Sequence, residues 1–452
     1  MAKKKQIELT IEEKLQNALV PKEEQPYKIP NNWCWVRLES INKYKSETLN
    51  PKNAMEKMFE LYSVPSFDNK YPEILIGKDI GSNKYIVKKN DILLCKINPR
   101  INRVWQVYQH TNFGQICSSE WIVIRNEILN KSFLRYYFTS EYFRNRLCEN
   151  VSGVGGSLTR AKPKLVQLYE VPLSPINEQQ RIVNRIESLF TKLDRAKELI
   201  ENALAQFEQN KMAILHKAFI GELTAKWRKE NNIDLSSWQE KTVDELCTSL
   251  KYGTSKKSNP EGSVVVLRMG NLQNGEIDWS NLMYTDDKDD IEKYLLKKGD
   301  VLFNRTNSPE LVGKTSIYRG EYPAIYAGYL IKLDYGKDII GEYLNYMMNS
   351  TKAKHYCYTV KTDGVSQSNI NAKKIGAFEI PVPTIEEQQE IVNILDRLLA
   401  KYNKIKNLEQ QLEKIELLKK AILAKAFRGE LDTNNPDEES AENLLKEILA
   451  EK

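Results

Sequence analysis

Two long segments of the chain carry apolar residues at alternating intervals of four and three positions. This spacing is typical of helices that pair along a heptad seam, and it predicts helices over residues 177–219 and 386–427. Each would be on the order of 60 Å long. One seam cannot bury itself, so the two helices most simply pair with each other. The first seam contains Ile182, Ile186, Leu189, Leu193, Ala196, Ile200, Ala203 and Phe207. The second contains Ile391, Leu395, Leu398, Tyr402 and Ile405, is out of step at Leu408, and continues through Leu412, Ile415, Leu418 and Ile422.

The flanks of both predicted helices are repeated as well. Residues 171–186 recur as residues 380–395, and both stretches contain Ile-x-Glu-Gln-Gln-x-Ile-Val after a proline-containing extended segment. Proline fixes φ before a helix, and Asn177 or Glu178 places an acceptor beside its free N–H groups. Both helices end at Ala-Phe-x-Gly-Glu-Leu, where the glycine suits a left-handed helix end. The chain is therefore a duplication.

A globular domain of strands and short helices precedes each long helix. Both domains begin at a tryptophan, Trp33 or Trp238, and both contain Lys-Lys-x-Asp followed by a short apolar run that predicts a buried strand. A polar loop follows each of these strands, at residues 95–103 and 304–310, and a Gly-rich polar loop comes later in each copy. Most other side chains differ between the two copies. We therefore expect the two domains to share a backbone arrangement, called the frame below, and to differ in their surface side chains.

These patterns predict an α+β fold, with two pseudo-repeated mixed α/β domains joined by two long helices. Thr10 and Glu13 have the spacing of a capping box at the start of a short helix. Lys3, Lys4 and Lys5 are interpreted as a solvated end in preference to a nucleic-acid arm. The last segment is acidic, and its narrow apolar face is expected to pack near the N-terminal helix. The predicted segments are an N-terminal helical segment (1–32), the first domain (33–175), a central helix (176–224), a linker (225–237), the second domain (238–384), a C-terminal long helix (385–431) and an acidic helix (432–452).

Composition restricts the class of protein. Of the 452 residues 41% are hydrophobic and 28% are charged, as in proteins with a globular core. No apolar run approaches the ~20 residues of a membrane helix, so we expect a cytoplasmic protein. Six cysteines without a Cys-x-x-Cys pair, together with only three histidines, argue against a disulfide framework and against a zinc site. Residues 33–170 carry 21 Lys+Arg against 13 Asp+Glu, which fits a phosphate-facing surface and also a solvated basic surface without a partner.

The sequence contains no recognisable catalytic motif. Gly313-Lys314-Thr315 resembles the end of a phosphate-binding loop, but Ser308 stands where the first glycine is required. No glycine-rich cofactor loop follows a predicted strand, and no cluster of acidic residues suggests a nuclease. We therefore interpret the chain as a recognition component without a metal site.

The duplicated motifs resemble the specificity subunits of Type I restriction-modification systems across essentially the whole chain. The likeness rests on the motifs at both helix starts and both helix ends, on Trp-x-x-x-x-Leu or its variant at both domain starts, and on Lys-Lys-x-Asp-x-Leu in both domains. The resemblance implies two target recognition domains, each binding one half of a bipartite, asymmetric site on double-stranded DNA. It also implies that the two long helices pair antiparallel as a coiled-coil spacer.

The same resemblance implies partners and assigns the chemistry to them. Two modification subunits would dock on the spacer, bind S-adenosylmethionine and methylate adenine. Restriction subunits would then join and use ATP and Mg²⁺. This chain would be the non-catalytic subunit of that methyltransferase and endonuclease complex, with no cofactor of its own.

Candidate contact residues follow from the chemistry of base edges, because Arg pairs with guanine and Asn or Gln with adenine. An ordinary solvated loop residue is the alternative at each position. In the first domain the candidates are Asn98, Arg100, Asn102, Arg103, Thr159 and Arg160. In the second they are Asn304, Arg305, Asn307, Ser366, Gln367, Ser368 and Asn369, with Lys256 and Lys257 as phosphate contacts. The helical period predicts an exposed, partner-contacting face at Gln179, Gln180, Gln388 and Gln389, although helix capping also explains their repetition.

Two other classes of function are compatible with the heptads. A coiled-coil adaptor that carries two protein-binding domains would lack DNA sequence preference and a steep salt dependence of DNA binding. An enzyme that acts alone on DNA would show activity when the purified chain is incubated with DNA, Mg²⁺, ATP and S-adenosylmethionine.

Overall fold

The computed structural model describes residues 9–152, 159–400 and 405–451. Contacts divide the chain into two compact units, of which unit 1 is Met1–Leu199 with Gln410–Lys452 and unit 2 is Ile200–Glu409. Each unit contains one of the two globular domains, and unit 1 also contains the end of the chain. The seven segment boundaries inferred from the sequence stay predictions.

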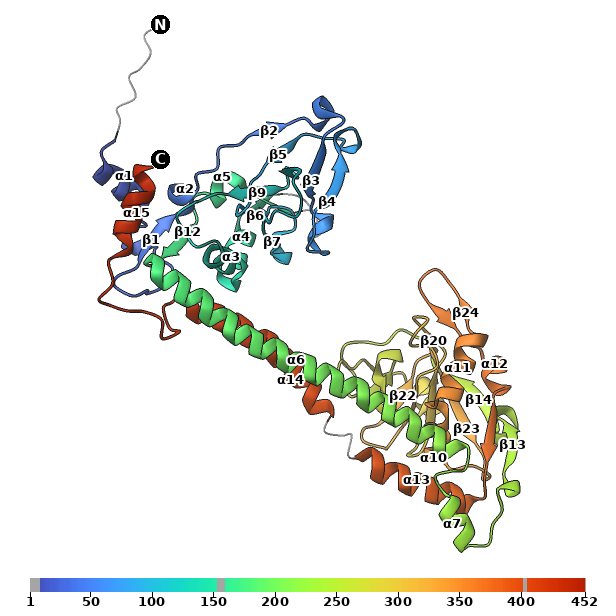
Figure 1. Ribbon diagram of the computed structural model, residues 1–452. Helices are drawn as coiled ribbons and strands as arrows, with labels where there is room; N and C mark the ends of the chain where they lie inside the picture. Colours follow the sequence, from blue (N-terminus) through green and yellow to red (C-terminus); the bar gives the residue numbers. More distant parts are fainter. Residues whose placement is uncertain (1–8, 153–158, 401–404, 452) are drawn as a thin grey trace. The chain divides into compact units, whose positions relative to one another are not determined.

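Unit 1 is built on two main sheets, coloured blue to green in Figure 1. Its strands are β1 (Cys34–Arg37), β2 (Thr48–Leu49), β3 (Met58–Tyr62), β4 (Glu73–Ile76), β5 (Lys84–Ile86), β6 (Ile92–Cys95), β7 (Val104–Gln106), β8 (Gly114–Cys117), β9 (Trp121–Ile124), β10 (Val151–Ser152), β11 (Arg160–Ala161) and β12 (Glu170–Leu173). One sheet has the order β2-β5-β8-β3-β4, in which β3 and β8 run parallel. The other has the antiparallel order β7-β6-β9.

The first and the last helix of the described residues meet within unit 1. The short helices of this unit are α1 (Ile11–Ala18), α2 (Leu38–Ile41), α3 (Lys131–Thr139), α4 (Glu141–Glu149), α5 (Pro163–Val166) and α15 (Ala441–Ala450). Thr10 and Glu13 form the predicted capping box of α1. Helix α15 packs on α1, as predicted, and Lys446 Nζ lies 3.2 Å from Glu12 Oε1 (Figure 1). The lysine run at residues 3–5 lies outside the described residues.

Unit 2 has the same kinds of element in a different sheet arrangement. Its strands are β13 (Gln239–Thr242), β14 (Cys247–Tyr252), β15 (Val264–Leu267), β16 (Leu272–Gln273), β17 (Glu276–Ile277), β18 (Tyr284–Thr285), β19 (Val301–Asn304), β20 (Thr306–Asn307), β21 (Thr315–Ile317), β22 (Ala324–Tyr326), β23 (Leu330–Tyr335), β24 (Thr362–Asp363), β25 (Ser368–Asn369) and β26 (Glu379–Val382). Its short helices are α7 (Ala225–Glu230), α8 (Val243–Leu246), α9 (Lys288–Tyr294), α10 (Gly341–Met348), α11 (Thr351–Val360) and α12 (Ala372–Gly376). The main sheets have the orders β14-β23-β19-β21 and β18-β15-β22.

The two domains share a common frame. In each, the first strand pairs antiparallel with the strand that leads into a long helix, as β1 with β12 and β13 with β26. The strand after Lys-Lys-x-Asp is β6 or β19, and it pairs with β9 or β23. The aspartate closes the turn before it, because Asp91 and Asp300 accept from the backbone N–H three residues earlier at 2.8 and 2.9 Å. These predicted strands and the predicted duplication are confirmed.

The first predicted long helix is confirmed as α6 (Ile176–Phe219), a helix of 44 residues. The structure describes the second predicted helix as α13 (Ile385–Ala400) and α14 (Ile405–Ala426), while residues 401–404, with Tyr402 of the predicted seam, lie outside the described residues. Gly221 and Gly429 have the left-handed φ angles predicted for the helix ends, 79° and 75°.

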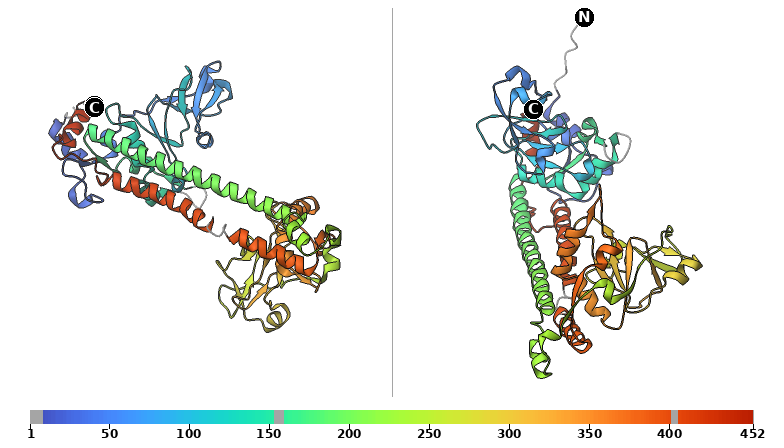
Figure 2. Two further views of the ribbon diagram at one scale, coloured as in Figure 1. Left: turned by 60° about the horizontal axis from the view of Figure 1, so that its bottom comes forward. Right: turned by 90° about the vertical axis from the view of Figure 1, so that its right-hand side faces the viewer.

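Within unit 1 the first part of α6 lies beside α14 in an antiparallel arrangement (Figure 2). Asp194 pairs with Lys419, and Lys197 Nζ lies 3.4 Å from Glu416 Oε1, so the partner number falls as the α6 number rises. Ile182 and Ile186 of the seam are buried, whereas the seam residues from Leu189 to Phe207 are only half-buried. Leu215 and Ala218 near the other end of α6 are buried as well, so the two ends of this helix are its best-packed parts. No helix within the described ranges is long and apolar enough to cross a membrane.

Candidate nucleic-acid interface

Two loops at equivalent positions carry most of the predicted DNA-contacting residues. The first-domain loop is residues 95–103, which begin at the last residue of β6. The second-domain loop is residues 304–310, which begin at the last residue of β19. A buried polar atom without a hydrogen bond costs about 1–3 kcal/mol, so each such atom needs a structural or functional explanation. Both loops contain buried polar atoms with no partner among the described residues: Asn98 Oδ1, Asn102 Oδ1, Arg103 Nε, Asn304 Nδ2 and Arg305 Nε.

The first-domain loop is a rigid turn. Asn98 and Asn102 flank a short 3-10 helix, η5 (Pro99–Ile101), and have left-handed φ angles of 48° and 52°. Asn tolerates this conformation better than most side chains. Asn102 Nδ2 donates to Phe138 O at 3.0 Å, which ties the turn to the end of α3. Arg100 is exposed on the turn, so a fixed backbone presents it to solvent.

Thr159 and Arg160 lie against the same loop. The Asn98 N–H donates to Thr159 O at 2.8 Å, and Ile97 forms a β-bridge with Arg160. The Arg160 side chain is 46% exposed, and its Nε donates to Glu120 Oε2 at 3.3 Å. The structure thus brings all six first-domain candidates together. The Gly-rich loop that precedes Thr159 lies outside the described residues at positions 153–158.

In the second domain a network of side chains orients Arg305. Its Nη2 donates to Asn369 Oδ1 at 3.1 Å, and Asn369 Nδ2 in turn donates to Thr306 Oγ1 at 2.8 Å. The guanidinium also lies over the Tyr252 ring, 4.9 Å from its centroid. Tyr252 is held in place because its hydroxyl accepts from the Ala372 N–H at 2.9 Å. Asn369 therefore positions Arg305, with its amide oxygen and one of its two amide N–H groups bonded within the protein.

Other second-domain candidates lie inside the protein. Asn304 and Ser368 are fully buried. Asn304 Oδ1 accepts from the Thr306 N–H at 3.3 Å, and the Ser368 hydroxyl donates to Asp363. Both side chains thus hold the loop and do not lie on its surface. They are buried because the last residue of β19 and the first residue of β25 lie within paired strands, which the sequence did not reveal.

The remaining candidates are on the surface. Ser366 and Gln367 are exposed in the hairpin between β24 and β25, and Asn307 is half-buried, with its Oδ1 accepting from the Ser308 N–H at 2.8 Å. Lys257 is exposed. Lys256 Nζ donates to Asp287 at 2.7 Å, and that hydrogen bond raises the pKa of Lys256.

The exposure predicted for the repeated glutamines is wrong for two of the four. Gln179 and Gln388 are fully buried, because a loop of each domain folds over the helix start. Gln179 donates to Ser174 O at 2.9 Å and accepts from the Asn130 N–H at 3.0 Å. Gln388 bonds in the same way, to Pro383 O and from the Ile340 N–H. Gln180 and Gln389 are exposed, as predicted.

The glutamate before each glutamine pair anchors the domain to its helix. Trp33 Nε1 donates to Glu178 at 2.7 Å, and Trp238 Nε1 donates to Glu387 at 2.9 Å. Of the two residues offered as the acceptor at this helix start, Asn177 or Glu178, Glu178 instead accepts from the Trp33 and Asn434 side chains. Burial raises the pKa of Glu178 above its ordinary value of 4.5. The sequence showed the repeated Trp and the repeated Glu, but their pairing was not predicted. That both residues recur in both copies was the signal from which the pairing could have been inferred.

Tyr252 was also missed, because a single aromatic residue at the end of a predicted strand gives no signal of its own. It became visible as a site residue only through its contact with Arg305.

The chain is similar to known proteins over most of its length. A model of the family described as Type I restriction modification DNA specificity domain matches the chain twice, over residues 30–206 and 236–417. The chain is 28% identical over 399 residues to the Type I restriction enzyme EcoKI specificity subunit of Escherichia coli (strain K12), with 84% of each chain covered. It is 23% identical over 446 residues to the MjaVIII specificity subunit of Methanocaldococcus jannaschii, with 92% of this chain and 96% of that one covered.

Solved structures share the fold. A chain from a structural study of complex assembly and conformational transition of the type I R-M system has a TM-score of 0.70 and 22% identity, covering 90% of this chain and 100% of that one. The crystal structure of the HsdS subunit from Thermoanaerobacter tengcongensis has a TM-score of 0.51 and 22% identity, covering 90% and 99%. Since the family match covers both domains and most of the chain, this protein belongs to the Type I restriction modification DNA specificity domain family.

Proposed function

We propose that this chain is the DNA-recognition subunit of a Type I restriction-modification complex, in which each domain binds one half of a bipartite, asymmetric DNA site. The observation that carries the proposal is that one family of domain occurs twice, with different side chains on equivalent loops. An equivalent frame supports the same kind of contact in both domains. Different side chains on that frame support two different half-sites.

The chemistry of the two loops supports base recognition. An oriented guanidinium can donate two hydrogen bonds to the O6 and N7 atoms of guanine, and Arg305 is held by Tyr252 and Asn369 in a partly open position. Arg100 is exposed on a rigid turn in the first domain. Rigid presentation lowers the entropy lost when a side chain binds a base.

We assign the chemical steps to partner subunits and describe this chain as non-catalytic. Modification subunits would bring S-adenosylmethionine, and restriction subunits would bring ATP and Mg²⁺. The chain itself would select the DNA sequence and hold those subunits on it in the cytoplasm.

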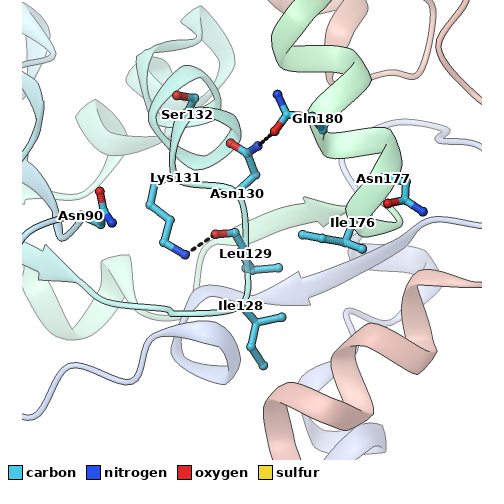
Figure 3. A pocket seen from close by; sticks show the side chains of 9 residues that line it. All are labelled: Asn90, Ile128, Leu129, Asn130, Lys131, Ser132, Ile176, Asn177 and Gln180. Carbon is cyan, nitrogen blue, oxygen red and sulfur yellow. Dashed lines mark hydrogen bonds between the residues drawn. The ribbon is translucent and has the colours of Figure 1, made fainter.

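We infer that two modification subunits dock at the two helix-start surfaces, which are Ile176 with Gln180 in unit 1 and Ile385 with Gln389 in unit 2. The two isoleucines occupy equivalent positions in the repeat, and they are 39% and 40% exposed even though residues next to them are buried. In unit 1 this surface lines an open groove of about 580 Å³, where Asn130 donates to Gln180 Oε1 at 2.8 Å (Figure 3). Two like surfaces fit two copies of one partner.

Replacing Ile176 with Asp should remove one bound modification subunit, and Ile385→Asp should remove the other. A charge at the centre of an apolar contact should weaken that contact by at least about 30-fold, as for other interface anchors. Native mass spectrometry of the assembled complex measures the number of copies. Leu199→Asp is the control, because Leu199 is 54% exposed but lies near the middle of α6. Retention of both copies by the Ile176→Asp, Ile385→Asp double variant would contradict the docking proposal.

A genome-wide map of methylated bases tests the function. Cells that carry the cognate modification subunit are compared with and without this chain. We expect a split, asymmetric motif that appears only with the chain. If the partner is bound and competent but no chain-dependent motif appears, the protein is instead an adaptor.

A further inference from the structure

Residue 96 of the first domain and residue 305 of the second domain occupy the same place in the shared frame. The Lys96 N–H donates to Glu120 O at 3.0 Å, and the Arg305 N–H donates to Tyr329 O at 3.0 Å. The Lys96 carbonyl accepts from the Ala161 N–H at 2.8 Å, and the Arg305 carbonyl accepts from the Ile370 N–H at 2.8 Å. Both backbone groups of the two residues are therefore bonded in the same way.

This pattern fixes the direction of the side chain. In an extended segment the backbone hydrogen bonds lie in the plane of the sheet, and the side chain points out of that plane. Because N–H and C=O bond to corresponding neighbours in both domains, the side chains of Lys96 and Arg305 leave equivalent positions on the same face of the frame. Both residues are cationic and half-buried.

The neighbours of this position differ between the domains. In the second domain Asn369 bonds to Arg305 and orients it. At the corresponding place in the first domain, Arg160 bonds to Glu120. Among the described residues the Lys96 ammonium has neither a hydrogen bond nor an ion pair, so no protein group competes with a ligand for it.

We propose that Lys96 and Arg305 are corresponding specificity residues, and that each contacts a guanine in the half-site of its own domain. This inference rests on the proposed function. Lysine, like arginine, donates to O6 and N7 of guanine in the major groove.

The test measures binding of the assembled complex to a panel of DNA duplexes in which each base pair of both half-sites is replaced in turn. Lys96→Ala should reduce discrimination roughly 5- to 150-fold at one G·C pair of one half-site. Arg305→Ala should do the same in the other half-site. The half-site left unchanged by each variant shows that the variant is folded and assembled. Lys96→Arg should retain the preference for guanine.

Lys89→Ala is the charge-matched control, since Lys89 is exposed in the turn before β6, whereas Lys96 comes directly after that strand. It should leave discrimination at every position unchanged. If Lys96→Ala weakens all duplexes by one factor, or changes none, the assignment of Lys96 is overturned while the proposed function stands. If the wild-type complex itself shows no sequence preference, both are overturned.

Discussion

Replacing Glu387 with Gln should lower the free energy of unfolding of unit 2 by about 3–5 kcal/mol. Glu387 is fully buried, and Arg228 Nη1 donates to its Oε1 at 2.5 Å while only 8% of the Arg228 side chain is exposed. The substitution leaves the buried guanidinium without its counter-charge. Hydrogen exchange of β19 and β23 under native conditions measures the loss, because these strands lie in the core of unit 2.

Glu178→Gln is the matched control, because the same repeat position in unit 1 has no arginine bonded to it among the described residues. Its Oε2 accepts from Trp33 and from Asn434 at 3.0 Å, and an amide oxygen can accept both bonds. We expect a change of at most about 1 kcal/mol at neutral pH. If Glu387→Gln and Glu178→Gln lower the free energy of unfolding by equal amounts, the ion pair of Glu387 with Arg228 is not the cause of the loss in unit 2.

The control also has its own dependence on pH. Burial raises the pKa of Glu178 above 4.5, so the folded state binds this proton more tightly than the unfolded state. The contribution of Glu178 to the stability of unit 1 should therefore fall as pH rises from below 4.5 through the raised pKa. Glu178→Gln should abolish that loss, which urea titrations of the two proteins at several pH values would measure.

Replacing Phe427 with Ala should destabilise unit 1 by about 3–5 kcal/mol. The Phe427 ring is 1% exposed, and its centroid lies 5.3 Å from that of Phe133 and 5.1 Å from that of Tyr137. The lost ring leaves a cavity between the C-terminal segment and the first domain. Limited proteolysis should then cleave residues 410–452 faster than in the wild type.

Phe219→Ala is the control for this prediction, because it stands at the same place in the other Ala-Phe-x-Gly-Glu-Leu motif. Its ring packs 5.4 Å from that of Tyr343 in unit 2. We expect its effect to fall on unit 2. Unchanged cleavage of the C-terminal segment in Phe427→Ala would contradict the packing role of Phe427.

Local patterns predicted the elements that local forces determine. The heptads of α6 and the turn aspartates Asp91 and Asp300 depend on nearby residues, and both were predicted correctly. Burial of Gln179 and Gln388 depends on loops that are distant in sequence, such as those of Asn130 and Ile340, so periodicity alone misplaced them.

The candidate site shows the same contrast between features set by nearby residues and features set by residues distant in sequence. The polar character of the two loops predicted where Asn98 and Arg305 lie, because each loop follows a strand that the sequence identifies. It did not predict that Asn304 is enclosed, because that depends on the pairing of β19 with β23. Lys96 became a candidate only when backbone bonds aligned it with Arg305, although both are cations at equivalent positions of the repeat.

The division of the chain into units has a consequence for synthesis on the ribosome. Unit 2 is one continuous stretch, whereas the core of unit 1 includes Leu423, Phe427 and Leu445 from the end of the chain. Ribosomes add about 5–20 residues per second, so the roughly 210 residues of unit 2 take about 10–40 s to make. During that time the apolar side chains of the first domain that pack against the end of the chain remain exposed to solvent. The domain that is translated first is therefore the one whose fold is completed last.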